Sequence, residues 1–258
     1  MDGKHVLGLP IEYQEMPEYF DAHNINAETE TKNALIEKLL KGHAVKSVLD
    51  MTCGTGSQVF YLAERGYEVV GSDFSPSLLN IARSKAEKSG VKLTFIDGDM
   101  RTLRVGKFDA VITIFNAIGH LVKADFEKAL QNIRANLSTG GLYLFDILNL
   151  EALTDEVLKT FTMDIESTVN GVKIRNTQYS EIDRKHGFLV SHDQYTLFRP
   201  GNEPEIRTNQ FSLQLYATDE LNKILNHNGF DIIHQYDWEG NDFCAISSLS
   251  MLTLARKR

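Results

Sequence analysis

The spacing of apolar residues changes repeatedly along this chain, and the order of the changes predicts an α/β fold. Short apolar runs typical of buried strands alternate with segments whose apolar residues recur every three or four positions, as on one face of a helix. Such alternation indicates a parallel sheet with helices on both faces. We expect strands near 46–50, 67–72, 92–97, 108–114 and 141–146, and helices near 29–41, 57–65, 76–89 and 123–137.

The pattern changes after residue 149. Segments rich in β-branched and aromatic residues follow one another over 160–215, and turn signals such as Asn170-Gly171 separate them. This pattern predicts an antiparallel sheet inserted into the α/β core. A helix is expected over about 218–228, with Thr218 as its N-cap. Final strands are expected over 230–237 and 249–255.

The same pattern divides the chain into three segments. Residues 1–150 are expected to form an N-terminal cap, with short helical pieces around 11–20, and the cofactor-binding half of the core. Residues 151–217 form the inserted segment, which we expect to cover the substrate, and residues 218–258 complete the core.

Composition narrows the class of partner. The chain has 258 residues, 42% of them hydrophobic, and a formal net charge of −8. An acidic chain of this kind favours a small-molecule substrate over nucleic acid. Its two cysteines, Cys53 and Cys244, form neither a metal-binding nor a disulfide pattern. Because residues 1–5 lack an apolar signal core and no long apolar run occurs, we expect a cytoplasmic protein without a membrane segment.

The run VLDMTCGTGSQ at 48–58 carries the clearest chemistry. An apolar strand ends at Asp50, a tight turn contains Gly54 and Gly56, and an amphipathic helix begins directly afterwards. Glycines allow the backbone to approach a ligand, and the start of the helix presents unpaired amides. A second acid, Asp73, ends the next strand 23 residues after Asp50, which is about the spacing of an acid that binds a ribose.

Two nucleotide-binding classes share such a turn. A dinucleotide-dependent oxidoreductase would need a third glycine near Val59, which the chain lacks. The run instead resembles motif I of class I S-adenosylmethionine-dependent methyltransferases, with Thr52 in place of a first glycine. The resemblance implies a Rossmann-like core with a seven-stranded, mostly parallel sheet, and S-adenosyl-L-methionine as the cofactor.

The resemblance also implies roles for single residues. Asp50 would accept hydrogen bonds from the methionine ammonium, Asp73 would bind the ribose hydroxyls, and Phe74 would stack beside adenine. Asp99 and Met100, after the third strand, match the acidic loop that binds the adenine edge, whereas Asp97 is expected in a turn. The remaining residues expected to bind the cofactor are Thr52, Cys53, Gly54, Gly56, Phe115 and Tyr19.

The end of the fourth strand supplies the catalytic candidates. Asn116 and His120 interrupt an apolar stretch at the sheet edge where open α/β folds bind ligands. We expect His120 to accept a proton or to bind the cofactor carboxylate, and Asn116 to orient the substrate. Capping of the following helix is the structural alternative for His120.

The segment 109–121 is similar to glycine and sarcosine N-methyltransferases, and the inserted sheet is placed as in sugar-amine N-methyltransferases. The arginine that grips the cofactor carboxylate in the glycine enzymes has no counterpart near Ala27. Tyr13 or Tyr19 would close over the sulfonium through the face of its ring. These observations favour methyl transfer to an amine of a small polar molecule. An O- or C-methyltransferase and a catalytically silent cofactor-binding module remain as alternatives.

Overall fold

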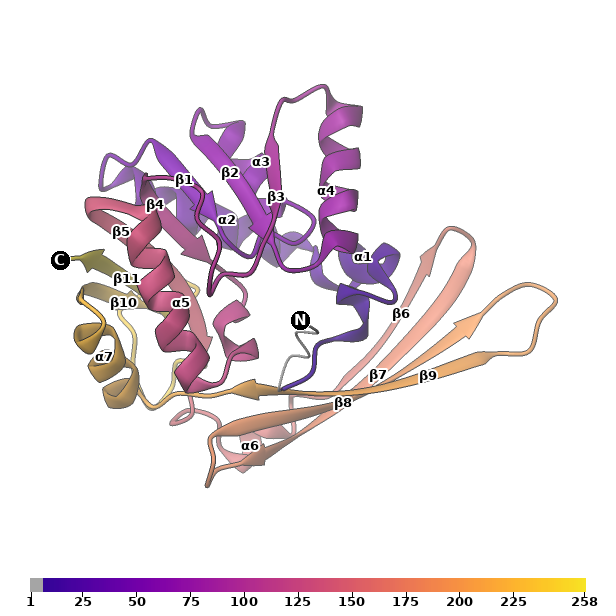
Figure 1. Cartoon of the computed structure of the whole chain (residues 1–258). Helices are drawn as coiled ribbons and strands as arrows, with labels where there is room; N and C mark the ends of the chain where they lie inside the picture. The colour runs from indigo at the N-terminus through magenta and orange to yellow at the C-terminus, as the bar shows by residue number, and fades with distance from the viewer. Residues whose placement is uncertain (1–6) are drawn as a thin grey trace.

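The structure is a computed structural model that describes residues 7–258 (Figure 1). The prediction about a signal core concerns residues that lie outside this range. Within it, a central sheet of seven strands has the order β10-β11-β5-β4-β1-β2-β3. Its strands are Ser47–Asp50 (β1), Glu68–Asp73 (β2), Thr94–Asp97 (β3), Phe108–Thr113 (β4), Leu137–Leu148 (β5), Phe230–Tyr236 (β10) and Ser250–Lys257 (β11).

The central sheet is mostly parallel, as the sequence predicts. β1 pairs in parallel with β2 and β4, and the outer pairs β2–β3 and β4–β5 are parallel as well. β11 lies antiparallel between β5 and β10. β5 is longer than the predicted 141–146, because Leu137 already pairs with Phe108 ahead of a register shift.

Helices cover both faces of this sheet (Figure 1). Successive residues of β5 point to opposite faces, so that Leu142 and Leu144 belong to one apolar cluster and Tyr143 and Phe145 to the other. The helices of the first cluster are α2 (Ala27–Lys41), α3 (Ser57–Ala63) and α4 (Pro76–Ser89), and those of the second are α5 (Lys123–Asn136) and α7 (Thr218–His227). The predicted alternation of strands and helices is thereby confirmed.

Residues 163–214 form the second sheet, which projects from one side of the core (Figure 1). Its antiparallel strands are Met163–Val169 (β6), Val172–Asp183 (β7), Phe188–Phe198 (β8) and Glu205–Gln214 (β9). Asn170 and Gly171 both adopt positive φ in the first hairpin, which confirms the predicted turn. In β8, every second residue from Leu189 to Leu197 is buried, so one face of the sheet packs inward.

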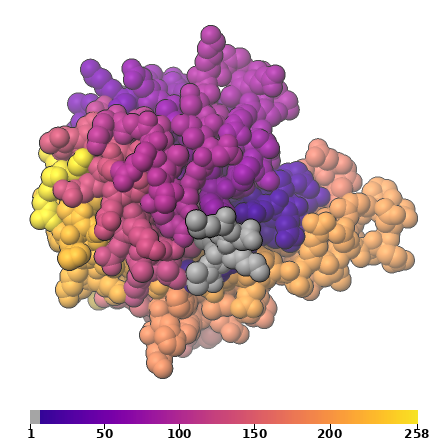
Figure 2. Space-filling model, viewed as in Figure 1, coloured from indigo at the N-terminus to yellow at the C-terminus, as the bar shows by residue number. Residues whose placement is uncertain are grey.

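The N-terminal segment lies between the core and the projecting sheet, as Figure 2 shows in indigo. It consists of short helical turns, η1 (Ile11–Tyr13), η2 (Pro17–Tyr19) and α1 (Phe20–Asn24), which agrees with the sequence. The buried side chains of this segment and of the inner face of the sheet form one apolar cluster, made of Ile11, Met16, Tyr19, Ile174, Tyr195 and Leu197. The N-terminal segment therefore connects the core with the second sheet.

One predicted cap is wrong. α7 begins where the sequence indicates, but Ala217 is its N-cap and makes no side-chain hydrogen bond there. The backbone amide and hydroxyl of Thr218 instead donate to the Glu151 carboxylate, at 3.0 and 2.6 Å. A local pattern cannot reveal this partner, because Glu151 is 67 residues away in the chain.

Two short elements complete the fold, η3 (Ala117–His120) and α6 (Asp155–Leu158). Among the described residues, no helix combines the length and the apolar composition that a membrane crossing requires.

Candidate active site

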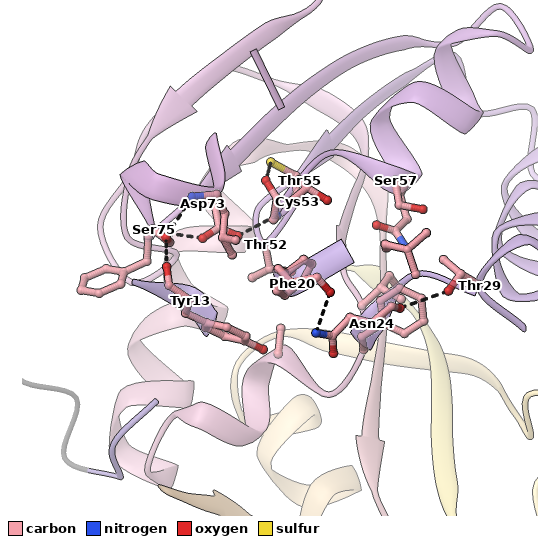
Figure 3. A pocket seen from close by; sticks show the side chains of 18 of the residues that line it. Tyr13, Phe20, Asn24, Thr29, Thr52, Cys53, Thr55, Ser57, Asp73 and Ser75 are labelled. Atoms are coloured by element: carbon pink, nitrogen blue, oxygen red, sulfur yellow. Dashed lines mark hydrogen bonds between the residues drawn. The ribbon is translucent and has the colours of Figure 1, made fainter. Parts of the chain in front are cut away.

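The carboxyl ends of β1, β2 and β4 open onto one cavity, which we call the first cavity. This is the edge at which open α/β sheets bind ligands. Figure 3 shows Asp73 and Thr52 on one side of it and Asn24 and Thr29 on the other. Several predicted residues are among its described lining: Thr52, Cys53, Gly54, Asp73, Phe74, Met100, Phe115 and His120. Asp50, Gly56, Asp99, Asn116 and Tyr19 are not among the residues that line it.

The glycine turn and the acid of β2 are built as one unit. Gly54 has φ +53, a conformation that favours glycine, and its amide donates to Asp73 Oδ2 at 2.8 Å. Asp73 Oδ1 accepts from the Ser75 amide at 2.8 Å, while Ser75 itself is the N-cap of α4. Burial raises the pKa of Asp73 to about 6 despite these hydrogen bonds. The carboxylate is therefore fixed in direction and ionised at neutral pH.

Asp50 lies behind the turn and is 1% exposed. Its Oδ1 accepts from the Thr52 amide at 3.1 Å, whereas Oδ2 is buried without a hydrogen-bond partner among the described residues. Thr52 Oγ1 is buried in the same unpartnered state. Burial raises the pKa of Asp50 to about 8. Two acceptor atoms without donors at a strand end fit a ligand that brings donors or positive charge.

Cys53 and Gly56 support the turn from within. Burial raises the pKa of the Cys53 thiol well above its usual value, so the thiol is not poised for reaction. Gly56 is the N-cap of α3 with φ +94, and a Cβ there would lie 2.9 Å from the Phe60 ring. Gly56 thus shapes the turn without lining the cavity.

The structure separates Asp99 from Met100, which the sequence grouped together. Met100 lines the first cavity, whereas the carboxylate of Asp99 faces the guanidinium of Arg101, whose Nε lies 3.0 and 2.9 Å from its two oxygens. Arg101 also binds Asp125 at 2.6 Å. Asp99 pairs with Arg101 and is not among the residues that line the first cavity, so its contact with adenine stays a prediction. Asp97 binds Arg83 instead, also at 2.6 Å.

The tyrosine at the cavity is Tyr13 and not Tyr19. Tyr19 is 3% exposed and packs in the apolar cluster beneath the second sheet. Tyr13 lines the first cavity, and its ring makes edge contacts with Phe20 and with His120. The Tyr13 hydroxyl lies 3.3 Å from His120 Nε2. Both tyrosines lie in short helical turns, so periodicity did not distinguish them.

The loop after β4 is held in a strained form. Phe115 and Asn116 have φ +62 and +56, which is uncommon for residues other than glycine. The Asn116 amide lies 3.0 Å from both oxygens of Asp146, and its side-chain oxygen accepts from the Leu148 amide at 3.0 Å. Burial raises the pKa of Asp146 to about 6. Asn116 therefore fixes the loop that carries Phe115 and His120.

Lys32 of α2 is a lining residue that the sequence reasoning missed. Its Nζ lies 5.6 Å from the ring centre of Phe115 and 5.3 Å from that of Trp238. It also lies 3.6 Å from Glu28 Oε2, one turn earlier on the helix. A lysine in the middle of an amphipathic helix gives no signal of a cavity, because solvent-facing lysines have the same spacing.

A second cavity adjoins the first and has a volume of about 310 Å³. The inner face of the second sheet forms one wall, and the N-terminal segment and the loop after β4 form the others. Four residues line both cavities: Tyr13, Asn24, Phe115 and His120. Asn116 lines only the second cavity. The two cavities therefore meet at the His120–Tyr13 pair.

Comparison with known families decides the class. The model of the methyltransferase domain family matches residues 48–141, which include the glycine turn, Asp73 and the loop after β4. Residues 48–141 therefore belong to a methyltransferase domain. The predicted family and its cofactor, S-adenosyl-L-methionine, are confirmed, and so is the predicted fold class.

Individual relatives agree with this class. The glycine/sarcosine N-methyltransferase of Parasynechococcus marenigrum is 37% identical over 134 residues, which cover 50% of this chain and 48% of that protein. The demethylmenaquinone methyltransferase of Thermus thermophilus is 44% identical over 102 residues, or 38% of this chain and 45% of that protein. The chain thus spans less than half of the length of each of these relatives.

Solved structures match nearly the whole fold. A S-adenosylmethionine-dependent methyltransferase from Clostridium acetobutylicum has a TM-score of 0.75 and 18% identity, covering 93% of this chain and 96% of that one. A S-adenosylmethionine-bound amino pentose methyltransferase from Micromonospora echinaspora has a TM-score of 0.73 and 17% identity, covering 95% and 97%. At this identity the match establishes the fold alone, including the placement of the second sheet.

Proposed function

We propose that this protein transfers a methyl group from S-adenosylmethionine to an amine nitrogen of a small polar acceptor. The observation that carries the proposal is the junction of the two cavities at Tyr13 and His120. An acceptor in the second cavity can approach a cofactor in the first there, and such positioning supplies much of the catalysis in a displacement reaction. The name of the glycine/sarcosine N-methyltransferase supports nitrogen as the acceptor atom.

The residues of the first cavity fit S-adenosylmethionine. Asp73 fits the ribose hydroxyls, because an ionised carboxylate only accepts hydrogen bonds. The unpartnered oxygens of Asp50 and Thr52 fit the donors of the methionine ammonium. Lys32 fits the carboxylate, in place of the arginine that glycine N-methyltransferases use. Phe74 and Met100 fit the adenine edge. When bound, the cofactor supplies a methyl group on a cationic sulfur.

His120 is the proposed base for the acceptor. An ammonium has no free lone pair, so the acceptor must lose a proton before it attacks. Burial raises the pKa of Tyr13 well above its usual range, so its hydroxyl keeps its proton at neutral pH. The phenol oxygen can orient the imidazole by accepting a hydrogen bond from Nε2–H, 3.3 Å away, which leaves Nδ1 as the nitrogen that takes the proton. Asn116 acts as a positioning residue, because its side chain is bonded to the Leu148 amide.

Replacement of His120 by asparagine is expected to lower kcat by roughly 10²–10⁴-fold, the usual contribution of a general base. Cofactor affinity should change far less. The measurement is radiolabelled methyl transfer to a panel of amines, amino acids, phenols and carboxylates, together with calorimetry of S-adenosylhomocysteine. His234→Asn is the matched control, because His234 is exposed and bound to Asp242 at 2.7 Å, outside both cavities.

The panel also tests the alternatives. Turnover with phenols or carboxylates only would replace the nitrogen assignment by oxygen. Binding of the cofactor without turnover on any acceptor would favour a binding module. Equal losses of affinity and rate in His120→Asn would make His120 a cofactor ligand.

Affinity for S-adenosylhomocysteine is expected to rise with pH between about 5 and 8. Burial raises the pKa values of Asp73 to about 6 and of Asp50 to about 8, so both carboxylates hold protons at the acidic end. Ribose hydroxyls and an ammonium bind the ionised forms better, so binding releases protons and strengthens by up to about tenfold per pH unit for each proton released. Calorimetry in buffers of different ionisation enthalpy measures this release. Asp50→Asn should flatten the upper part of the profile, and a flat profile in the native protein would contradict both assignments.

A further inference from the structure

The second cavity contains two acids for which the proposed reaction has no use. Glu12 of η1 and Asp193 of β8 both line it and are 6% and 4% exposed. Glu12 belongs to the N-terminal segment and Asp193 to the inner face of the second sheet, so two different walls each contribute one carboxylate.

In each of these carboxylates, one oxygen accepts a hydrogen bond and the other has no donor among the described residues. Tyr195 donates its hydroxyl to Glu12 Oε1, and Gln178 donates Nε2 to Asp193 Oδ1 at 2.6 Å. Glu12 Oε2 and Asp193 Oδ2 are buried and have no hydrogen-bond partner among the described residues. The side-chain oxygen of Asn176, which also lines the cavity, is in the same state.

Unpartnered buried acceptors are costly unless a ligand supplies donors. An ammonium group offers three N–H donors and a positive charge, which matches three acceptor oxygens of which two belong to acids. The cavity therefore has acceptor oxygens without donors and acidic side chains, both of which a protonated nitrogen would satisfy.

The charges around Glu12 and Asp193 also favour a cationic ligand. No lysine or arginine is among the described residues that line this cavity. His23 is the basic group beside the pair, with Nδ1 3.8 Å from Glu12 Oε1. Burial, with a smaller contribution from Glu12, raises the pKa of Asp193 to about 6, so Asp193 is ionised above that pH. Apolar side chains such as Met163, Leu189 and Phe211 complete the walls. An apolar channel with acids set into it suits a short alkyl chain that ends in a cation.

We infer that the acceptor carries a second, cationic nitrogen that Glu12 and Asp193 hold while a separate amine is methylated beside His120. The part of this inference that concerns methylation rests on the proposed function. The class of acceptor is then a small alkyl diamine. The cation site itself is a statement about binding and can be tested without any methyl transfer.

The test is calorimetry of diaminobutane with the protein saturated in S-adenosylhomocysteine, at about pH 8, where Asp193 is ionised and both amines of the ligand are largely protonated. Butylamine and aminobutanol are the matched ligands without the second charge, and diaminopropane and diaminopentane vary the length. We expect at least one diamine to bind about tenfold or more tightly than its uncharged analogues, the scale of lost hydrogen bonds to a charged group. Glu12→Gln and Asp193→Asn should each remove most of that preference.

Glu181→Gln is the control for net charge, because Glu181 is exposed on β7 of the same sheet. Retained affinity for S-adenosylhomocysteine shows that each variant is folded. A diamine preference without methylated product would support the cation site and reject the proposed reaction. Methylation of monoamines as readily as of diamines would support the reaction and overturn the cation site. Equal binding of all ligands, or a preference that survives both substitutions, would also overturn it.

Discussion

Replacing Asp73 with alanine is expected to weaken binding of S-adenosylhomocysteine by about 1.5–3 kcal/mol, or roughly 10–150-fold, the usual range for hydrogen bonds to a charged group. The proposed ribose contacts would be lost, and so would the bond from the Gly54 amide at 2.8 Å. The second loss matters because the Gly54 amide, in a turn of positive φ, would lose its side-chain acceptor. Calorimetry at neutral pH measures the change.

Asp97→Asn is the matched control for this substitution. Asp97 pairs with Asp73 across the β2–β3 ladder, but its side chain is 53% exposed and binds Arg83 outside the cavity. The affinity of Asp97→Asn for S-adenosylhomocysteine should equal that of the native protein. The affinity of Asp73→Asn for S-adenosylhomocysteine should lie between those of Asp73→Ala and Asp97→Asn, because an amide keeps one acceptor oxygen and loses the charge. Native affinity in Asp73→Ala would remove Asp73 from the ribose site.

The first cavity was largely predictable because its signals are local in sequence. The turn after β1 needs positive φ at Gly54 and an acid at a strand end, and both requirements can be read within 48–58. The parallel order of the strands then brings Asp73 to the same edge. Helix boundaries followed from caps such as Ser75, whose hydroxyl accepts from the Leu78 amide at 3.2 Å.

The residues that were missed depend on contacts between distant segments. Glu12 and Asp193 read as ordinary polar positions until the N-terminal segment packs on β8 and buries both. Asp146 gives no signal alone, since its partner Asn116 lies 30 residues earlier. Asp99 is a different case, because its partner lies only two residues away in the chain. Its neighbour Arg101 competes for the carboxylate, and the motif says nothing about that competition.

Replacing residues 160–215 with a short Gly/Ser loop is expected to abolish methyl transfer while cofactor binding stays measurable. None of the described residues that line the first cavity belongs to the second sheet, whereas the sheet supplies a whole wall of the second cavity. A change in loop length alone alters closure entropy only slightly. Some loss of cofactor affinity is expected, because Ile11, Met16 and Tyr19 lose their packing partners while neighbouring Tyr13 lines the first cavity.

Ser191→Phe tests the same wall without removing it. Ser191 is 3% exposed on the inner face of β8 and lies 3.0 Å from the hydroxyl of Ser180, so a phenyl ring there would fill the second cavity. We expect transfer to fall at least about tenfold, because filling a packed site blocks or displaces the acceptor, with affinity for S-adenosylhomocysteine unchanged. Gln194→Phe, an exposed position of the same strand, is the control. Circular dichroism establishes that each variant is folded. Full activity in the trimmed protein, or in Ser191→Phe, would mean that the acceptor binds elsewhere, because no contact with this wall could then be needed for transfer.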